Sequence, residues 1–234
     1  MNGEFAMDKY ARLRYQPCLP LGRDGRKVTA SPEHAALSRK AAGEGMVLLK
    51  NENETLPLKR GSRVAVFGKA QADYVKGGGG SGDTTVAYVH SLAQGLRMKQ
   101  DEGKIEIFEP LERFYAEDVK AQYAAGATPG KTREPILDDA LVQQARAFTD
   151  TAVITICRFS GEDYDRTGQP HDGDYFLSFE EEHMVRKVLA AFPRVAVVLN
   201  TGGMMDTLWF KDNPAVGAAL LAWQGGMEGG FDYI

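Results

Sequence analysis

Short apolar segments alternate with longer amphipathic segments along most of the chain. The apolar segments are continuous and rich in β-branched residues, as in strands that are covered on both faces. They predict strands at residues 63–68, 104–109, 151–157, 194–200 and 215–223. The amphipathic segments carry apolar residues at helical spacing. They predict helices at residues 33–51, 87–99, 111–125, 135–149 and 178–192.

Strands that alternate with helices in this way form mainly parallel sheets with helices on both faces. We therefore predict an α/β fold, an open α/β sandwich with flavodoxin-like layers, over residues 31–234. Ser31 and Pro32 mark its start, because a serine followed by a proline in the first turn is typical of a helix N-terminus. Residues 1–30 are basic and turn-rich without a clear period, and we interpret them as an N-terminal arm.

The loops that follow parallel strands meet at one edge of the sheet, and ligands bind there. Four such loops are rich in glycine or polar residues. Their sequences are KAQADYVKGGGGSGDTT after Gly68, RFSGEDYDR after Cys157, TGGMMD after Asn200 and QGGMEGG after Trp223. We expect these four loops to form the candidate site.

The glycine run at residues 77–80 first suggests a phosphate-binding loop. The lysine is misplaced for that role, because Lys76 precedes the glycines and no basic residue follows Ser81 directly. Two other interpretations stay open. The loop is either a flexible surface turn or the wall of a neutral polyol pocket, where Ser81 or Asp83 offers a hydrogen bond.

Glu162 lies a few residues beyond the predicted strand 151–157, in a turn that Gly161 loosens. An isolated loop glutamate is usually only a solvated acid. This one is flanked by Arg158 and Arg166, which lie near enough in sequence to organise the loop, and we interpret Asp165 with Arg166 as a local ion pair. If Glu162 is catalytic, its partner carboxylate should come from another part of the protein.

The charge balance and the cysteines exclude several classes of function. The 28 basic and 32 acidic residues give a net charge of -4, so no nucleic-acid partner is predicted. Cys18 and Cys157 form neither a disulfide framework nor a metal-ligand spacing, and we interpret Cys157 as a core residue. The four histidines are scattered, so no metal site is predicted either.

The sequence shows no sign of an export signal or of a membrane-spanning segment. The first residues lack the apolar region of a signal peptide, and no segment reaches the roughly 18 apolar residues of a membrane span. The sequence therefore predicts a cytoplasmic protein without a membrane partner.

Five motifs in order resemble the second domain of family 3 glycoside hydrolases, from about residue 33 to residue 230. The motifs are GMVLLKNENETLPL, GGGGSGDT, SGEDYDR followed by GDYFLSFEEE, VVLNTGG and AALLAWQGGMEGG. One of them alone would be weak, whereas the series is specific. The chain begins close to these motifs and ends at GGFDYI. We therefore expect a sandwich that is incomplete at its C-terminus and that precedes its partner domain, as in permuted members of the family.

The resemblance implies a fold partner, an activity and a set of site residues. In that family a (β/α)8 barrel supplies the aspartate nucleophile, and the sandwich lends a glutamate as general acid/base. Glu162 matches that glutamate, and Ser81, between Gly80 and Gly82, matches a loop serine that contacts the sugar. The implied protein is a retaining β-glycosidase without a cofactor, most simply a β-glucosidase acting on terminal non-reducing β-D-glucosyl residues. The chain alone would be inactive, because the nucleophile lies outside it.

Two other functional classes stay open at this stage. The sandwich could be a non-catalytic carbohydrate-binding or structural module, in which case replacing Glu162 would change nothing. A nucleotide or flavin binder is favoured only by the layered fold, and the position of Lys76 argues against it.

Overall fold

The computed structural model describes residues 31–84, 86 and 88–231, and the predicted N-terminal arm lies outside these residues. The helices are α2 Pro32–Gly45, α3 Leu92–Asp101, α4 Glu109–Ala124, α5 Asp139–Phe148, α6 Phe179–Ala191 and α7 Leu208–Lys211. The strands are β1 Val47–Asn51, β2 Ser62–Phe67, β3 Ile105–Ile107, β4 Thr151–Arg158, β5 Arg194–Thr201 and β6 Val216–Leu221. Single 3-10 turns are η1 Lys69–Gln71, η2 Gly80–Gly82 and η3 Gly229–Phe231.

The six strands form one open sheet in the order β1-β6-β5-β4-β2-β3. All neighbours are parallel except β1, which pairs antiparallel with β6 at one edge. The strands β4 and β5 are the longest, and all but one of their residues are buried. The predicted α/β sandwich is therefore confirmed, with a parallel centre and one antiparallel edge strand.

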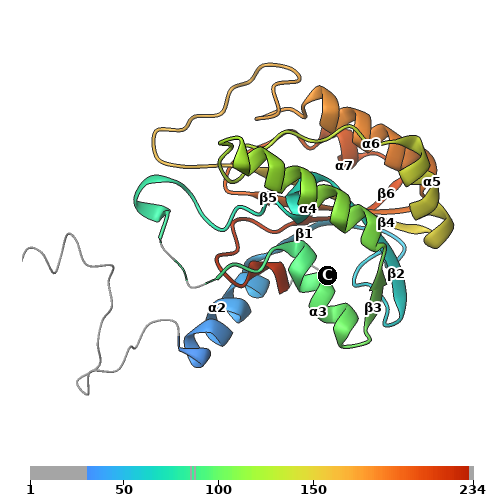
Figure 1. Cartoon of the computed structure of the whole chain (residues 1–234), viewed down its shortest axis with the longest axis horizontal. Helices are drawn as coiled ribbons and strands as arrows, with labels where there is room; N and C mark the ends of the chain where they lie inside the picture. The colour runs from blue at the N-terminus through green and yellow to red at the C-terminus, as the bar shows by residue number, and fades with distance from the viewer. Residues whose placement is uncertain (1–30, 85, 87, 232–234) are drawn as a thin grey trace, which may run out of the picture.

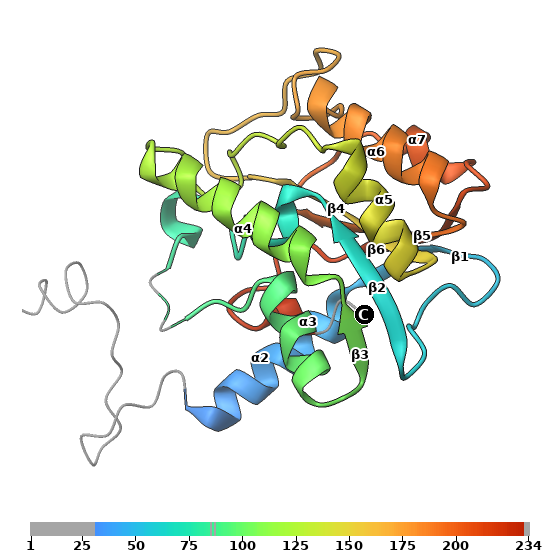
Figure 2. The same ribbon diagram turned by 45° about the vertical axis from the view of Figure 1, so that its right-hand side comes forward.

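Helices cover both faces of this sheet, as Figures 1 and 2 show. On one face the helices α4, α5 and α6 pack on a core that includes Phe67, Tyr115 and Met184. On the other face α3 packs on a second core through Leu92 and Leu96, and α2 lies beside it. Burial of apolar side chains on both faces is what the continuously apolar strand sequences predicted.

The first predicted helix is wrong in its last six residues, 46–51. Helix α2 begins as expected, with the Ser31 hydroxyl accepting a hydrogen bond from the His34 amide. It ends at Gly45, however, and the following residues form the edge strand β1. Two glycines near its end disfavour helix, and in β1 Val47 and Leu48 pair with Leu221 and Leu220 of β6. That pairing joins distant segments, so the local pattern could not show it.

The other predicted helices are confirmed with shifted ends: α3 begins and ends later than predicted, α4 begins earlier, and α5 and α6 are shorter at both ends. Helix α3 begins after Ser91, which forms a capping box with Gln94, and α5 begins after Asp138, which accepts a hydrogen bond from the Ala140 amide. Among the described helices, none combines the length and the apolar character that a membrane span requires. The loops after β2 and β4 extend beyond the same edge of the sheet, on the left in Figure 1, and this edge carries the candidate site.

Candidate functional site

Hydrogen bonds join the loops that follow β2, β5 and β6 at the carboxyl edge of the sheet. The side-chain oxygen of Asn200, near the end of β5, accepts from the Val75 amide at 2.7 Å. Its side-chain nitrogen donates to the carbonyl of Trp223 at 2.7 Å, and the Gly226 amide donates to the Lys76 carbonyl at 2.8 Å. The expected convergence of these loops is thus confirmed, with one buried amide at its centre.

The glycine-rich loop is closed on itself by Lys76. The Lys76 ammonium donates to the Asp83 carboxylate at 2.7 Å and to the Thr84 carbonyl at 2.9 Å. Its charge is therefore already paired across the ends of the loop, which weakens the phosphate-loop interpretation further. Ser81 lies in the turn η2, and its side chain falls outside what the structure describes.

The glycine-rich loop packs directly on the turn that carries Glu162. The Gly79 amide donates to the Ser160 carbonyl at 3.1 Å. Gly80 has φ +64, and a Cβ added there would lie 2.6 Å from Glu162 Oε2 and 3.0 Å from Glu162 Cβ. Gly80 is consequently required both for the left-handed backbone and for the close approach of the Glu162 side chain. Two site residues predicted from separate loops are thus brought together.

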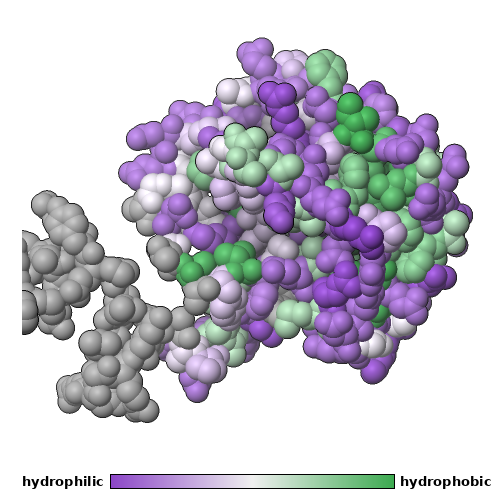
Figure 3. All heavy atoms as spheres, in the orientation of Figure 1, coloured by the Kyte–Doolittle hydropathy of each residue, from purple (hydrophilic) through white to green (hydrophobic). Residues whose placement is uncertain are grey.

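The Glu162 side chain is exposed. The hydrogen bonds and ion pairs among the described residues do not include its carboxylate. The Tyr164 amide donates to the Gly161 carbonyl at 3.2 Å, which closes the turn below it. Figure 3 shows a mostly hydrophilic surface over this loop, at the upper left of the molecule. The carboxylate is therefore available to a group that approaches from outside the sandwich.

Arg158 fixes the start of the Glu162 loop to helix α6. Its guanidinium forms a double contact with the Glu181 carboxylate at 2.7 and 2.6 Å, and both side chains are about 3% exposed. It also donates to the carbonyl of Asp174 at 2.7 Å. Glu181 in turn accepts from the Ser178 amide in the capping box of α6. This buried pair holds both ends of the 159–178 loop in one place.

Arg166 fixes the inner side of the same loop. It donates to the Phe159 carbonyl and the Ser160 hydroxyl, both at 2.8 Å, and to Thr201 Oγ1 at 3.2 Å. Its ionic partner is Asp174 at 2.5 Å. The predicted pair between Asp165 and Arg166 is therefore wrong. The prediction that Arg158 and Arg166 organise the loop is confirmed.

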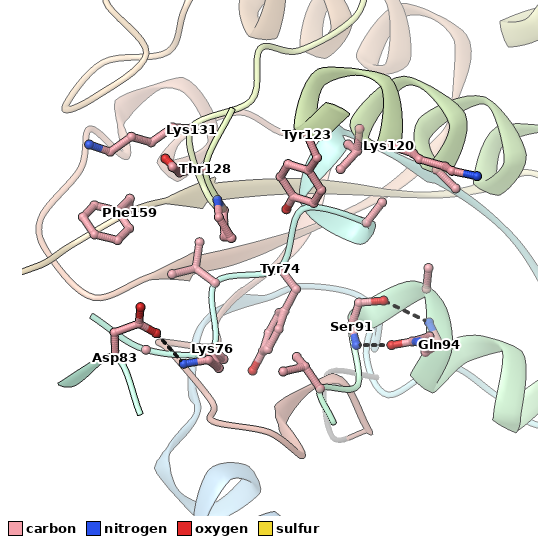
Figure 4. A pocket seen from close by; sticks show the side chains of 18 of the residues that line it. Tyr74, Lys76, Asp83, Ser91, Gln94, Lys120, Tyr123, Thr128, Lys131 and Phe159 are labelled. Atoms are coloured by element: carbon pink, nitrogen blue, oxygen red, sulfur yellow. Dashed lines mark hydrogen bonds and ion pairs between the residues drawn. The ribbon is translucent and has the colours of Figure 1, made fainter. Parts of the chain in front are cut away.

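Two hollows flank the loop. The larger, of about 840 Å³, is lined by Tyr74, Tyr123, Lys131 and Phe159 together with the backbone of the glycine run, as Figure 4 shows for the labelled side chains. The smaller, of about 430 Å³, is lined mainly by charged and polar residues, including those of the buried pair. Glu162 lines neither hollow. A ligand that contacts Glu162 would therefore have to approach from the open side of the edge.

Glu228 is a buried acid that the sequence pattern did not predict. Arg39 donates two hydrogen bonds to its Oε2, at 3.0 and 2.6 Å, and Tyr88 donates one to Oε1. Burial alone would raise the pKa of Glu228, but the hydrogen bonds from Tyr88 and Arg39 outweigh it and the pKa lies below its ordinary value. Glu228 ties the loop after β6 to α2. Its signal in the sequence is an acid that lies between two Gly-Gly pairs, 225–226 and 229–230.

Cys157 and the acids and histidines of the described residues show no sign of metal or thiol chemistry. Cys157 is fully buried in β4, and burial raises the pKa of its thiol to about 12, so its interpretation as a core residue is confirmed. Among the residues that the structure describes, no three His, Cys, Asp or Glu side chains are grouped so that they could hold a metal ion.

Comparison with known proteins gives consistent matches. Residues 46–233 match the model of the glycosyl hydrolase family 3 C-terminal domain. The chain is 46% identical to beta-glucosidase A of Butyrivibrio fibrisolvens over 96% of its length, and 34% identical to a beta-glucosidase of Ruminococcus albus over 85%. It spans only 29% and 21% of these two relatives.

Solved structures agree with these matches. A beta-glucosidase from Paenibacillus barengoltzii superposes with a TM-score of 0.77 at 35% identity, over 85% of this chain and 22% of that one. The beta-glucosidase 3B of Thermotoga neapolitana in complex with alpha-D-glucose gives a TM-score of 0.76 at 32% identity, over 88% of this chain and 29% of that one. The fold and the sequence therefore point to the same group of proteins.

Proposed function

The chain belongs to glycosyl hydrolase family 3, and its residues 46–233 correspond to the C-terminal domain of that family. We propose that this domain supplies the general acid/base of a retaining β-glycosidase. The nucleophile then belongs to a (β/α)8 barrel elsewhere in the same protein. The two relatives described above are named beta-glucosidases, so the substrate proposed is a terminal β-D-glucosyl residue. No cofactor is required for this chemistry.

The observation that carries the proposal is the Glu162 carboxylate, exposed on a loop whose base is fixed. A retaining glycosidase needs two carboxyl groups about 5 to 5.5 Å apart, on either side of the glycosidic bond. Arg158 and Arg166 hold the loop from within, while the carboxylate itself makes no hydrogen bond or ion pair with the described residues. It can therefore meet a sugar and a second carboxylate that a facing domain presents.

Glu162 acts twice in the proposed reaction. It first protonates the leaving oxygen while the nucleophile forms a covalent glycosyl-enzyme. It then takes a proton from the water that attacks this intermediate. The turn η2, with Gly80, Ser81 and Gly82, is proposed to face the bound sugar, since it lies beside Glu162. The 234-residue chain by itself is expected to be inactive, because it lacks the second carboxylate.

The test uses the full-length protein, wild type and Glu162→Ala, with an activated aryl β-glucoside and added azide. We expect Glu162→Ala to lower kcat by about 10²- to 10⁴-fold, and azide to restore turnover with a β-glycosyl azide as product. Asp163→Asn is the matched control, because Asp163 is the adjacent exposed acid of the same turn and asparagine tolerates its left-handed backbone. Full activity in Glu162→Ala would refute the assignment and favour a non-catalytic carbohydrate-binding or structural module.

A further inference from the structure

We infer that Phe159 is a positioning residue for Glu162 and that Lys131 and Tyr164 hold its ring in place. The inference rests on the proposed function, because it concerns how the proton-transferring carboxylate is aimed. Glu162 has no hydrogen bond or ion pair of its own among the described residues, so its placement depends on the backbone turn that carries it. That turn rests on Phe159.

The Phe159 ring lies against both backbone segments that meet at Glu162. A Cβ added at Gly79 would lie 2.8 Å from the ring atom Cζ, and one added at Gly161 would lie 3.0 Å from Cε1. The two glycines also touch each other, since a Cβ on Gly161 would lie 2.9 Å from the Gly79 nitrogen. One ring therefore supports the glycine-rich loop and the turn before Glu162 together.

A third segment closes over the ring from residues 130–131. A Cβ added at Gly130 would lie 3.1 Å from Phe159 Cβ. The Lys131 ammonium lies 4.8 Å from the centroid of the Phe159 ring and 4.2 Å from that of Tyr164. The two rings meet edge to face, with centroids 5.4 Å apart and an interplanar angle of 84°. These are favourable cation–π and aromatic geometries, and Figure 4 shows Lys131 and Phe159 on the same wall of the larger hollow.

The segment that carries Lys131 is itself anchored in the interior. Buried Asp73 accepts hydrogen bonds from the Gly130 amide, the Thr132 hydroxyl and the Tyr123 hydroxyl, each at 2.6 Å. Asp73 lies two residues beyond η1, the turn that follows β2. A continuous set of contacts thus runs from the sheet through Asp73 and Lys131 to the Phe159 ring, and from the ring to the turn of Glu162.

Removal of the ring would leave a gap between three glycine-containing segments. The turn could then shift while the strand and its buried ion pair stay in place. General acid catalysis requires the donor within hydrogen-bond distance of the leaving oxygen, and a misplacement of about 1 Å can cost about 10²-fold in rate. The loss should therefore appear in steps that need a proton from Glu162, and not in those that do not.

The test measures kcat/KM of the full-length protein for two β-glucosides, one with a good leaving group (2,4-dinitrophenyl) and one with a poor one (phenyl). Only the poor leaving group needs protonation. We expect Phe159→Ala to lower kcat/KM by about tenfold to a hundredfold on the phenyl glucoside and by less than about threefold on the dinitrophenyl glucoside. Lys131→Ala should show the same pattern with a smaller loss, and Lys131→Arg should restore the wild-type values.

Phe148→Ala is the matched control. Phe148 meets Phe108 at 5.5 Å and lies under the guanidinium of Arg63 at 3.9 Å, so it has the same kind of neighbours away from the site. A merely structural loss lowers kcat/KM for both glucosides by the same factor. Glu162→Gln, measured in parallel, reports on the proposed function itself.

The outcomes separate the two claims. A loss in Phe159→Ala that depends on the leaving group supports the inference. Suppose that the loss of kcat/KM in Glu162→Gln depends on the leaving group. An equal loss on both substrates in Phe159→Ala, or no loss, then overturns the inference, while the proposed function stands. If Glu162→Gln shows no such dependence, the proposed function fails, and the inference fails with it. If Phe159→Ala does not fold, Lys131→Ala and Lys131→Arg test the inference by the same criteria, because Lys131 is exposed.

Discussion

Two phenylalanines lie near opposite ends of the sheet, and each contacts a second aromatic ring and a cation. Phe148 packs with Phe108 and Arg63 at the end of α5, next to the start of β2. Phe159 packs with Tyr164 and Lys131 just after β4. The side-chain chemistry is nearly the same at both ends.

The difference lies in the backbone around the two rings. Phe148 joins the ends of regular elements, whereas Phe159 touches Gly79, Gly130 and Gly161, which belong to three separate loops. Regular elements are held by their own hydrogen bonds, so the ring at Phe148 adds only stability. Loops have fewer such bonds, so the ring at Phe159 also determines where they lie. This contrast predicts that substitutions at the two ends will differ in kind.

The largest expected effect is on stability and comes from Arg158→Met. The substitution leaves Glu181 buried without its ionic partner, and we expect unfolding to require about 3–5 kcal/mol less. The control is Arg63→Met at the other end, where the ion pair with Glu106 is exposed and is worth about 0–1 kcal/mol. Chemical denaturation of the full-length protein measures both. Equal losses would show that the two ends are not held differently.

Glu134→Gln should change how stability depends on pH. Burial raises the pKa of Glu134 to about 8, and its Oε2 accepts from the Lys69 amide at 2.8 Å. The folded state therefore binds a proton that the unfolded state releases between pH 4.5 and 8, and stability falls as the pH rises through this range.

We expect the glutamine variant to lack this decline. Calorimetry measures the unfolding midpoint of the variant minus that of the wild type. This difference should increase by roughly 5 °C between pH 5 and pH 8. Glu106→Gln, an exposed substitution on β3, is the control and should leave the pH dependence unchanged. A wild-type protein whose midpoint is flat between pH 5 and 8 would contradict the raised pKa.

The smallest expected effect in free energy is on activity and comes from Gly80→Ala. The added methyl would lie 2.6 Å from the Glu162 carboxylate, and we expect kcat/KM for an aryl β-glucoside to fall about tenfold, or about 1.4 kcal/mol. Gly61→Ala is the control, because Gly61 also has a positive φ, of +81, but no atom within 4 Å of an added Cβ. It should lower stability through backbone strain alone. Equal kcat/KM values in the two variants would show that Gly80 does not affect the placement of Glu162.

The sequence predicted the parallel strands of the sheet better than its antiparallel edge strand. Strands β2, β4, β5 and β6 are apolar on both faces, and this pattern is local. The edge strand β1 was hidden because its leucines continue the helical pattern of α2, and only pairing with β6, more than a hundred residues away, makes it a strand.

The candidate site could be predicted in its arrangement but not in its supports. Parallel topology brought Gly80 and Glu162 together, as expected from the order of strands and loops. The acids Asp73 and Glu228 were missed, because acids in glycine-rich loops usually face solvent and these two are buried. Arg166 was paired with the wrong acid, since its partner Asp174 becomes a neighbour only when the loop folds back. The catalytic role of Glu162 and the sugar contact of Ser81 stay predictions.

Asn200 has a consequence for the order in which the molecule forms. Its side chain binds the backbone of Val75, which lies 125 positions earlier in the chain, and that of Trp223, 23 positions later. Contacts over such separations form late, because the intervening chain must first lose its conformational freedom. During synthesis the hydrogen bonds between Asn200 and Val75 therefore form only after β5 has been made. A single amide thus ties the completion of this edge to the last strands of the sheet to be synthesised.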